Sequence, residues 1–201
     1  MTRIKLCGLS RPCDVEAANE LLPEYIGFVF WPESKRYVSP EVAANLRKNL
    51  AAGIKAVGVF VDESPERIAA LVWLGVIDVV QLHGHEDNAY ISRLRALTDK
   101  PIIQAVKVSS PLDLAKARES TADFVMLDSG TGTGQAFNWS LIHGFTRPYF
   151  LAGGLTPENV REAVNTLHPF AVDVSSGIET DGLKDRAKMA AFVEAVRKEE
   201  L

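Results

Sequence analysis

The chain has 201 residues, of which 47% are hydrophobic and 24% charged, and its formal net charge is −4. This length predicts one domain, residues 1–201, with its own hydrophobic core. The acidic balance argues against nucleic acid or a membrane surface as a partner, because both call for a basic stripe. Without an apolar run long enough to span a membrane, or a basic-then-apolar leader, we expect a cytoplasmic protein.

The first predicted strand, residues 3–7, ends by presenting a thiol. Side chains alternate between the two faces of a strand, so Lys5 and Cys7 share one face. Gly8 then ends the strand. Cys7 is either a small buried hydrophobe or a functional thiol. Together with Cys13 it fits neither a disulfide scaffold nor a four-ligand zinc site.

Short apolar runs alternate with amphipathic stretches along the chain, which predicts alternating strands and helices. We expect strands at residues 3–7, 26–30, 55–61, 77–82, 101–107, 123–127, 148–152 and 170–174. A hydroxyl residue followed by proline predicts a helix start, because the hydroxyl caps free N–H groups and proline fits the first helical position. Such starts are Ser10 with Pro12, Ser39-Pro40, Ser64-Pro65, Ser110-Pro111 and Thr156-Pro157. The helices at residues 110–120 and 138–144 should be the weakest.

Eight such units predict a compact, parallel, eight-stranded (β/α)8 barrel, the TIM-barrel fold, although about 250 residues is its usual size. The alternative is a doubly wound open sheet, whose strands are apolar on both faces. Here polar residues recur on one parity near the strand ends, as in a barrel lumen with a functional mouth. They are Lys5, Cys7, Gln81, His83, Asp128, Asp173 and Ser175. No Gly-x-Gly-x-x-Gly follows the first strand, which also disfavours the open sheet.

Two glycine-rich loops follow the seventh and eighth strands, where barrels of this kind bind phosphate. Gly153 and Gly154 let the backbone approach an anion, and Ser175, Ser176 and Gly177 add hydroxyl and backbone donors. Each loop alone is compatible with a tight turn, but the pair favours a phosphorylated small-molecule ligand. A third such loop, residues 130–134, is expected to wrap over the ligand, because it lacks the lysine-serine/threonine ending of a P-loop.

Asp128 ends the apolar sixth strand, where an unpaired carboxylate is costly to bury. It is either a cap for the following loop or a general acid whose pKa is raised by apolar surroundings. Cys7 would then be the complementary base, working as a thiolate. An ordinary thiol has a pKa of about 8.5, so nearby cations such as Lys5 would have to favour ionisation.

Two further side chains belong to the predicted mouth. Arg36, on the loop after the second strand, is either a solvated cation or a fork for a second carboxylate of the ligand. His83, after the fourth strand, is either a ligand-facing donor or a satisfied core histidine. The remaining histidines, His85, His143 and His168, are too dispersed for a metal cluster, so we expect no metal.

Taken together, these motifs resemble phosphoribosylanthranilate isomerase of tryptophan biosynthesis, in family order from residue 3 to about residue 188. The segments that carry the resemblance are Lys5-Leu6-Cys7-Gly8-Leu9, Gly27-Phe28-Val29-Phe30, Ser34-Lys35-Arg36-Tyr37-Val38-Ser39-Pro40, Val57-Gly58-Val59-Phe60, Val80-Gln81-Leu82-His83-Gly84, Leu127-Asp128, Gly132-Thr133-Gly134, Phe137-Asn138-Trp139, Leu151-Ala152-Gly153-Gly154-Leu155 and Val172-Asp173-Val174-Ser175-Ser176-Gly177-Ile178-Glu179. Two positions depart from the pattern: Gln135 and Asn138 stand where many members carry lysine and aspartate.

The resemblance implies an Amadori rearrangement of N-(5′-phosphoribosyl)anthranilate to 1-(2-carboxyphenylamino)-1-deoxyribulose 5-phosphate, without cofactor or metal. Asp128 would protonate the furanose ring oxygen, and Cys7 would remove the C2′ proton of the resulting Schiff base. Arg36 would hold the anthranilate carboxylate. The two loops would hold the phosphate through Gly153, Gly154, Ser175, Ser176 and Gly177. His83 would face the substrate.

Other phosphate-binding barrels are the nearest alternatives. An indole-glycerol phosphate synthase would need a lysine acid at a strand end, and a pentose-phosphate epimerase would need metal-ligating His and Asp from several strands. A ligand-binding barrel without catalytic function would need neither Cys7 nor Asp128. We expect the protein to be a monomer or a homodimer.

Overall fold

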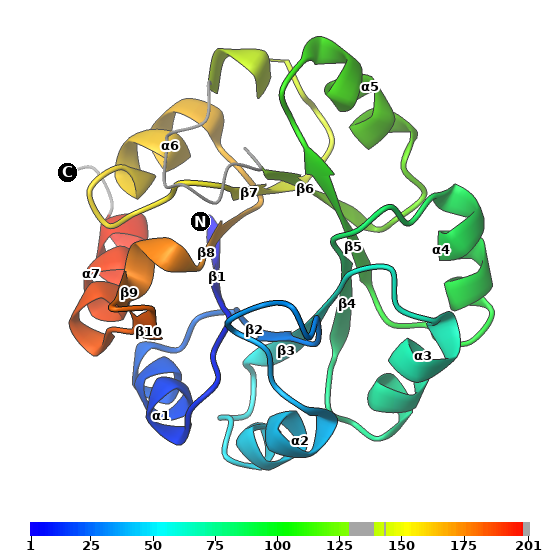
Figure 1. Ribbon diagram of the computed structural model, residues 1–201. Helices are drawn as coiled ribbons and strands as arrows, with labels where there is room; N and C mark the ends of the chain where they lie inside the picture. The colour runs from blue at the N-terminus through cyan, green and yellow to red at the C-terminus, as the bar shows by residue number, and fades with distance from the viewer. Residues whose placement is uncertain (129–138, 143, 199–201) are drawn as a thin grey trace.

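The computed structural model describes residues 1–128, 139–142 and 144–198. Within these residues, eight parallel strands close into a barrel in chain order, each pairing with the next and β8 pairing with β1, and helices surround it (Figure 1). The strands are β1 Arg3–Cys7, β2 Tyr25–Val29, β3 Lys55–Phe60, β4 Val79–Leu82, β5 Ile102–Lys107, β6 Phe124–Asp128, β7 Tyr149–Ala152 and β8 Ala171–Val174. The predicted (β/α)8 barrel is confirmed, and its strands fall within two residues of the expected ends.

Helices follow the strands on the outside of the barrel. They are α1 Pro12–Leu21, α2 Pro40–Lys48, α3 Pro65–Trp73, α4 Asn88–Arg95, α5 Pro111–Glu119, α6 Val160–Leu167 and α7 Arg186–Arg197, with the short 3-10 turns η1 Trp139–Ile142 and η2 Ser176–Ile178. After η2 the chain forms a small antiparallel hairpin of β9 Glu179–Thr180 and β10 Leu183–Lys184, which lies between β8 and α7. None of the described helices is long and apolar enough to cross a lipid bilayer.

Three of the five predicted helix starts are found where proline opens a helix after serine, at α2, α3 and α5. The Ser39 and Ser64 hydroxyls accept hydrogen bonds from the third residue of their helices, as expected for N-caps. Ser110 forms a capping box with Asp113. A helix of nine residues, α5, forms in the stretch 110–120, where the sequence predicts one of the two weakest helices. The stretch after β6 does contain only a 3-10 turn within its described part.

Of the two other predicted starts, Pro12 does open α1, whereas Thr156-Pro157 does not open α6. Arg11, not Ser10, occupies the N-cap position of α1. After β7, α6 begins three residues beyond Thr156-Pro157, with Asn159 as its N-cap. The Asn159 side chain accepts from the Thr156 N–H and donates to the Gly154 carbonyl, which closes a separate turn before the helix.

The two faces of the strands have different surroundings. Apolar side chains that point outward, such as those of Ile4, Leu6 and Phe28, form the main core beneath the helices. Inside the barrel, aromatic rings fill one end, where Phe150 packs edge-on against Tyr25 and Phe124 at centroid distances of 5.5 and 5.8 Å. The other end of the lumen, at the carboxyl ends of the strands, is left to polar side chains.

Candidate active site

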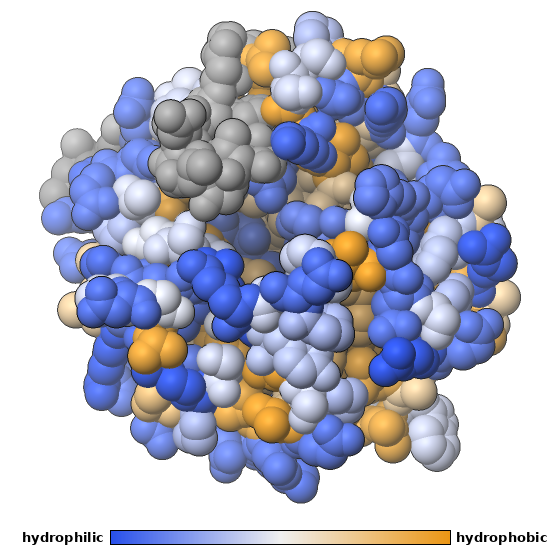
Figure 2. Space-filling model, in the orientation of Figure 1, coloured by the Kyte–Doolittle hydropathy of each residue, from blue (hydrophilic) through white to orange (hydrophobic). Residues whose placement is uncertain are grey.

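A cavity of about 340 Å³ opens at the carboxyl ends of the strands. Its described lining residues include the last residue of β1, Cys7, and the last residue of β6, Asp128, together with the loops after β7 and β8. Figure 2 shows hydrophilic side chains gathered around the hollow at the centre of this face. The sulfur and the carboxyl group that the sequence singled out therefore line one cavity, as a barrel mouth requires.

Cys7 occupies a space that its neighbour in the sheet leaves free. It lies opposite Gly27 in the β1–β2 pair, and a Cβ atom on Gly27 would come within 2.7 Å of the Cys7 sulfur. Val29 and Val59 pack around the thiol. Burial raises the pKa of the Cys7 thiol, and the negative charge of Asp173 adds to the effect, whereas Lys5 and Lys184 oppose it.

Lys5 lies below the thiol, fully buried in the lumen, with its Nζ 2.6 Å from an Asp173 carboxylate oxygen. Burial alone would lower the pKa of Lys5, but the charges of Asp173 and Cys7 outweigh it and the pKa is raised. The expectation that Lys5 favours a thiolate is correct in sign. Burial of Cys7 nevertheless outweighs the effect of Lys5 on the thiol pKa, since Lys5 is already paired with Asp173.

Asp128 faces His83 across the mouth, with 3.5 Å between the His83 Nε2 and a carboxylate oxygen. The Gln81 amide nitrogen lies 2.9 Å from the His83 Nδ1. His83 is thus no enclosed core histidine: 39% of its side chain is exposed, and it lines the cavity.

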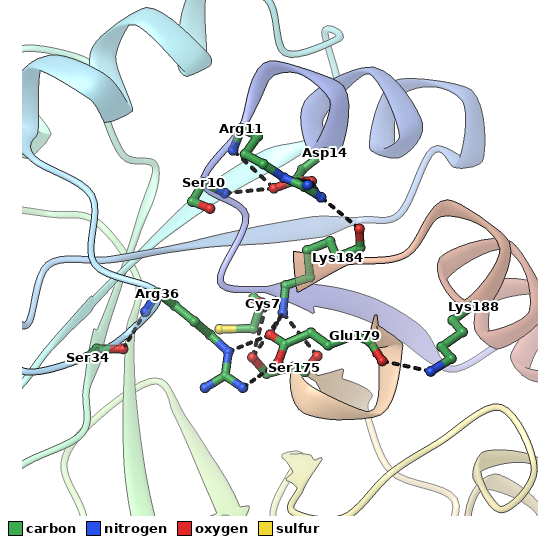
Figure 3. Close-up of polar contacts among 10 residues, drawn as sticks. All are labelled: Cys7, Ser10, Arg11, Asp14, Ser34, Arg36, Ser175, Glu179, Lys184 and Lys188. Carbon is green, nitrogen blue, oxygen red and sulfur yellow. Dashed lines mark hydrogen bonds and ion pairs between the residues drawn. The ribbon is translucent and has the colours of Figure 1, made fainter. Parts of the chain in front are cut away.

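Arg36 reaches the cavity from the loop after β2, and its guanidinium is held by Glu179 (Figure 3). The Nε and Nη2 atoms donate to the two carboxylate oxygens of Glu179 at 2.6 and 2.8 Å. Lys184 Nζ lies 2.6 Å from the same carboxylate. The hydrogen bond that Arg36 donates to Glu179 raises the pKa of Arg36. Burial alone would raise the pKa of Glu179, but the two cations outweigh it and the pKa is lowered.

The loops after β7 and β8 both border the cavity. Gly153 and Gly154 have φ angles of 91° and 68°, a left-handed backbone that favours glycine. Ser175 and Ser176 line the opposite side. The Ser175 hydroxyl donates to the Cys7 carbonyl at 3.1 Å, so its proton is already used within the protein. Gly177 is placed differently: it packs against the Leu155 carbonyl and is not among the described residues that line the cavity.

Several residues of the mouth escaped the sequence reasoning. Trp31 and Val59 line the cavity and give it an apolar wall, which the alternation along the second and third strands could have revealed. Glu179, which the resemblance included without giving it a role, and Lys184 come from the hairpin after η2. No sequence pattern gave a signal for this hairpin. The loop at residues 130–134, with Gln135, Asn138 and His143, lies outside the described residues. Among the rest, no group of three or more His, Cys, Asp or Glu side chains is placed to hold a metal ion.

Comparison with known proteins identifies the family. Residues 4–195 match the model of the N-(5'phosphoribosyl)anthranilate (PRA) isomerase family. The chain belongs to this family. The N-(5'-phosphoribosyl)anthranilate isomerase of Caldanaerobacter subterraneus subsp. tengcongensis is 43% identical over 204 residues, and the alignment covers 98% of each protein. The resemblance inferred from the motifs is confirmed, and the protein is an isomerase of the PRA isomerase family.

Solved structures of PRA isomerases share the fold closely. The Thermotoga maritima phosphoribosyl anthranilate isomerase is 38% identical, with a TM-score of 0.89 over 98% of this chain and 99% of that one. A second PRA isomerase structure, also 38% identical with a TM-score of 0.87 and the same coverage, is a complex with reduced 1-(o-carboxyphenylamino)-1-deoxyribulose 5-phosphate. That ligand combines a phosphate, an open sugar chain and an aryl carboxylate.

Proposed function

We propose that this PRA isomerase converts N-(5′-phosphoribosyl)anthranilate to 1-(2-carboxyphenylamino)-1-deoxyribulose 5-phosphate in tryptophan biosynthesis, within a single barrel domain. The observation that carries the proposal is that Cys7 and Asp128 line one cavity that also holds an arginine and two glycine- and serine-rich loops. The reaction needs one proton donor, one proton acceptor and two anion sites. No cofactor enters this chemistry, because the proton transfers leave the substrate's oxidation level unchanged overall.

The two anionic ends of the substrate fit two sides of the cavity. The phosphate would lie between the loops after β7 and β8, where Gly153, Gly154 and Ser176 offer backbone and hydroxyl donors. The anthranilate carboxylate would lie at Arg36, which lines the same cavity from the loop after β2. Trp31 and the valines beside Cys7 supply an apolar wall for the aromatic ring. Gly177 would support the phosphate loop from behind.

The chemistry then proceeds in two proton transfers between fixed groups. Asp128, as a carboxylic acid, gives its proton to the furanose ring oxygen, and the C1′–O bond breaks to leave an iminium ion. The Cys7 thiolate takes the proton from C2′, and the electron pair of that C–H bond moves to form the C1′=C2′ bond of a neutral enolamine. The enolamine becomes the ketone when its C2′ hydroxyl loses a proton and C1′ gains one. His83 faces both Asp128 and the sugar.

Turnover of freshly prepared N-(5′-phosphoribosyl)anthranilate, followed by fluorescence, tests this proposal. We expect Cys7→Ser and Asp128→Asn each to lower kcat by about 10²-fold or more, the usual size of a general acid–base contribution. Binding of the reduced product analogue should survive in both. Arg36→Ala should weaken binding of that analogue much more than binding of ribulose 5-phosphate, which lacks the carboxylate.

Three results would count against these assignments. A wild-type enzyme without turnover refutes the reaction. Near-normal kcat in Cys7→Ser or Asp128→Asn removes that residue from proton transfer. Equal losses for the two ligands in Arg36→Ala remove the carboxylate contact.

The remaining assignments concern the assembly and its compartment. Within the described residues every proposed site group comes from one chain, so we propose that a monomer is competent and that a homodimer adds no catalytic group. A Thermotoga maritima relative is described as dimeric. Light scattering at two concentrations, with kcat measured at each, tests this. We propose a cytoplasmic location, because Cys7 is a free thiol that oxidation would inactivate.

A further inference from the structure

Among the described residues, the side-chain partner of the Arg36 guanidinium is Glu179, which takes one side of it. Glu179 takes the side formed by Nε and Nη2, with both of its oxygens in hydrogen bonds. A guanidinium has five N–H donors in a planar fork. The Glu179 carboxylate binds side-on, to Nε and Nη2. It therefore leaves a second pair of donors, Nη1 and the outer hydrogen of Nη2, at the end of the guanidinium. This end has the geometry of a second two-point contact with a carboxylate.

Lys184 holds Glu179 from the other direction. The two residues are paired across the β9–β10 hairpin, and Lys184 Nζ lies 2.6 Å from the Glu179 Oε1. Lys184 Nζ also donates to the Ser175 carbonyl at 3.0 Å and to its hydroxyl at 3.2 Å. The side chain of Lys184 is almost fully buried. Glu179 is thus fixed on the phosphate-loop side as well as by Arg36.

The backbone of β1 completes the arrangement around Arg36. A Cβ atom on Gly8, directly after Cys7, would lie 2.6 Å from the Arg36 Cδ, so the side chain of Arg36 passes over a position that only glycine leaves open. The Ser175 hydroxyl donates to the Cys7 carbonyl. Figure 3 shows Arg36, Glu179 and Lys184 converging beside the Cys7 thiol. The three side chains carry two positive charges and one negative charge, which leaves one positive charge for the substrate's carboxylate.

We propose that Glu179, held by Lys184, is a positioning residue that presents the Nη1/Nη2 end of Arg36 to the substrate's aryl carboxylate. It thereby makes the site selective for arylamines that carry this group. The inference rests on the proposed function, in which Arg36 binds the carboxylate. Glu179 touches no substrate atom in this scheme and acts only through Arg36. Its effect must therefore appear on ligands with the carboxylate and be absent on ligands without it.

Two ligands separate this role from a general structural one. The first is the reduced product analogue, and the second is the same compound with a phenyl ring that lacks the carboxyl group. We expect Glu179→Gln to lower the affinity for the first ligand by about tenfold or more, the range for a hydrogen bond to a charged group. The affinity for the second ligand should stay within about twofold of the wild-type value. In an Arg36→Met background, the substitution of Glu179 should no longer change the ratio of the two affinities.

The control is Lys188→Met, on the same segment of chain. Lys188 is exposed and donates to the Glu179 backbone carbonyl, so its loss loosens the hairpin without touching the Glu179 carboxylate. The affinity ratio should stay at the wild-type value. If Glu179→Gln does not fold, Glu179→Gln/Lys184→Met removes both charges and leaves neither buried without a partner. Both ligands carry the phosphate, so the ratio still reports on Arg36 alone.

Each outcome decides the inference separately from the reaction. If Glu179→Gln lowers the affinity for both ligands equally, while the wild-type enzyme turns over its substrate, the positioning role is overturned and the proposed function stays intact. An unchanged ratio does the same. Absence of wild-type turnover, with the ratio changed as expected, overturns the proposed reaction while the role of Glu179 in carboxylate recognition stands.

Discussion

The space beside the Cys7 sulfur gives the sharpest structural prediction. Gly27 lies directly opposite Cys7 in the β1–β2 pair. In Gly27→Ala the new methyl group would lie 2.7 Å from the Cys7 sulfur and 3.2 Å from its Cα atom. Since carbon atoms prefer contacts of about 3.5–4.0 Å and sulfur is no smaller, the thiol must move by about 1 Å. A misplacement of about 1 Å at a reacting group can cost about 10²-fold in rate.

We therefore expect Gly27→Ala to lower kcat by about 10²-fold, while the KM changes little because the anion contacts are untouched. The matched control is Gly58→Ala, also in a strand. A Cβ atom there would lie 2.7 Å from the Phe60 ring and 2.8 Å from Ile77, both in the core beneath the helices. This variant should lose stability in urea unfolding, yet its folded molecules should keep the wild-type kcat.

Two results would refute the reasoning about Gly27. A kcat within about threefold of the wild type, in a variant with native circular dichroism, would show that the thiol tolerates the methyl group or does not react. Equal losses of kcat in Gly27→Ala and Gly58→Ala would show that strain in the barrel, rather than displacement of Cys7, lowers the rate.

Three further predictions concern charge. Because the Cys7 pKa is raised, alkylation of the ligand-free Cys13→Ser variant by iodoacetamide should accelerate with a midpoint above pH 9.0; a lower midpoint contradicts this. Lys5→Met should cost about 3–5 kcal/mol in urea unfolding, because Asp173 stays buried without its cation, whereas a loss below about 1 kcal/mol would show that water replaces it. The pKa of Asp113 is lowered to about 2 by hydrogen bonds from Ser109. The stabilisation that the Asp113 carboxylate provides is thus present above about pH 3.8 and lost toward pH 2. The free energy of unfolding of Asp113→Asn should therefore fall less steeply than that of the wild type as the pH is lowered through this range.

The barrel could be predicted because its physical requirements are local and repeated. Each strand is a short apolar run, and the polar side chains recur on one parity only near the strand ends. That is the pattern of a lumen with a reactive mouth rather than of an open sheet. Helix starts were predictable where serine and proline act on the adjacent backbone, as at Ser39 and Ser64. The prediction failed at Thr156, because the side chain of Asn159 closes a different turn first.

The candidate site was predictable only in part, for a related reason. Cys7, Asp128 and the glycine loops stand at strand ends, whose position at the mouth follows from the fold alone. The contact between Arg36 and Glu179 joins residues 143 positions apart, and the hairpin that carries Glu179 has no periodic pattern to announce it. The net direction of the Cys7 pKa was missed because it depends on how deeply the thiol is buried and on Asp173 pairing with Lys5.

These charge pairs suggest why the acid step should precede the base step. The cations near Cys7 are Lys5, Lys184 and Arg36, and each is already paired, with Asp173 or with Glu179. Their attraction for a thiolate is therefore largely offset, and burial, the largest effect, raises the pKa of the Cys7 thiol. In the proposed mechanism, protonation of the sugar by Asp128 would create an iminium ion, a new and unpaired positive charge, next to the sulfur. In that scheme the thiol would release its proton to the solvent in the cavity once this charge has formed, and the resulting thiolate would then take the C2′ proton. The closed sugar would thus be protected from premature loss of that proton.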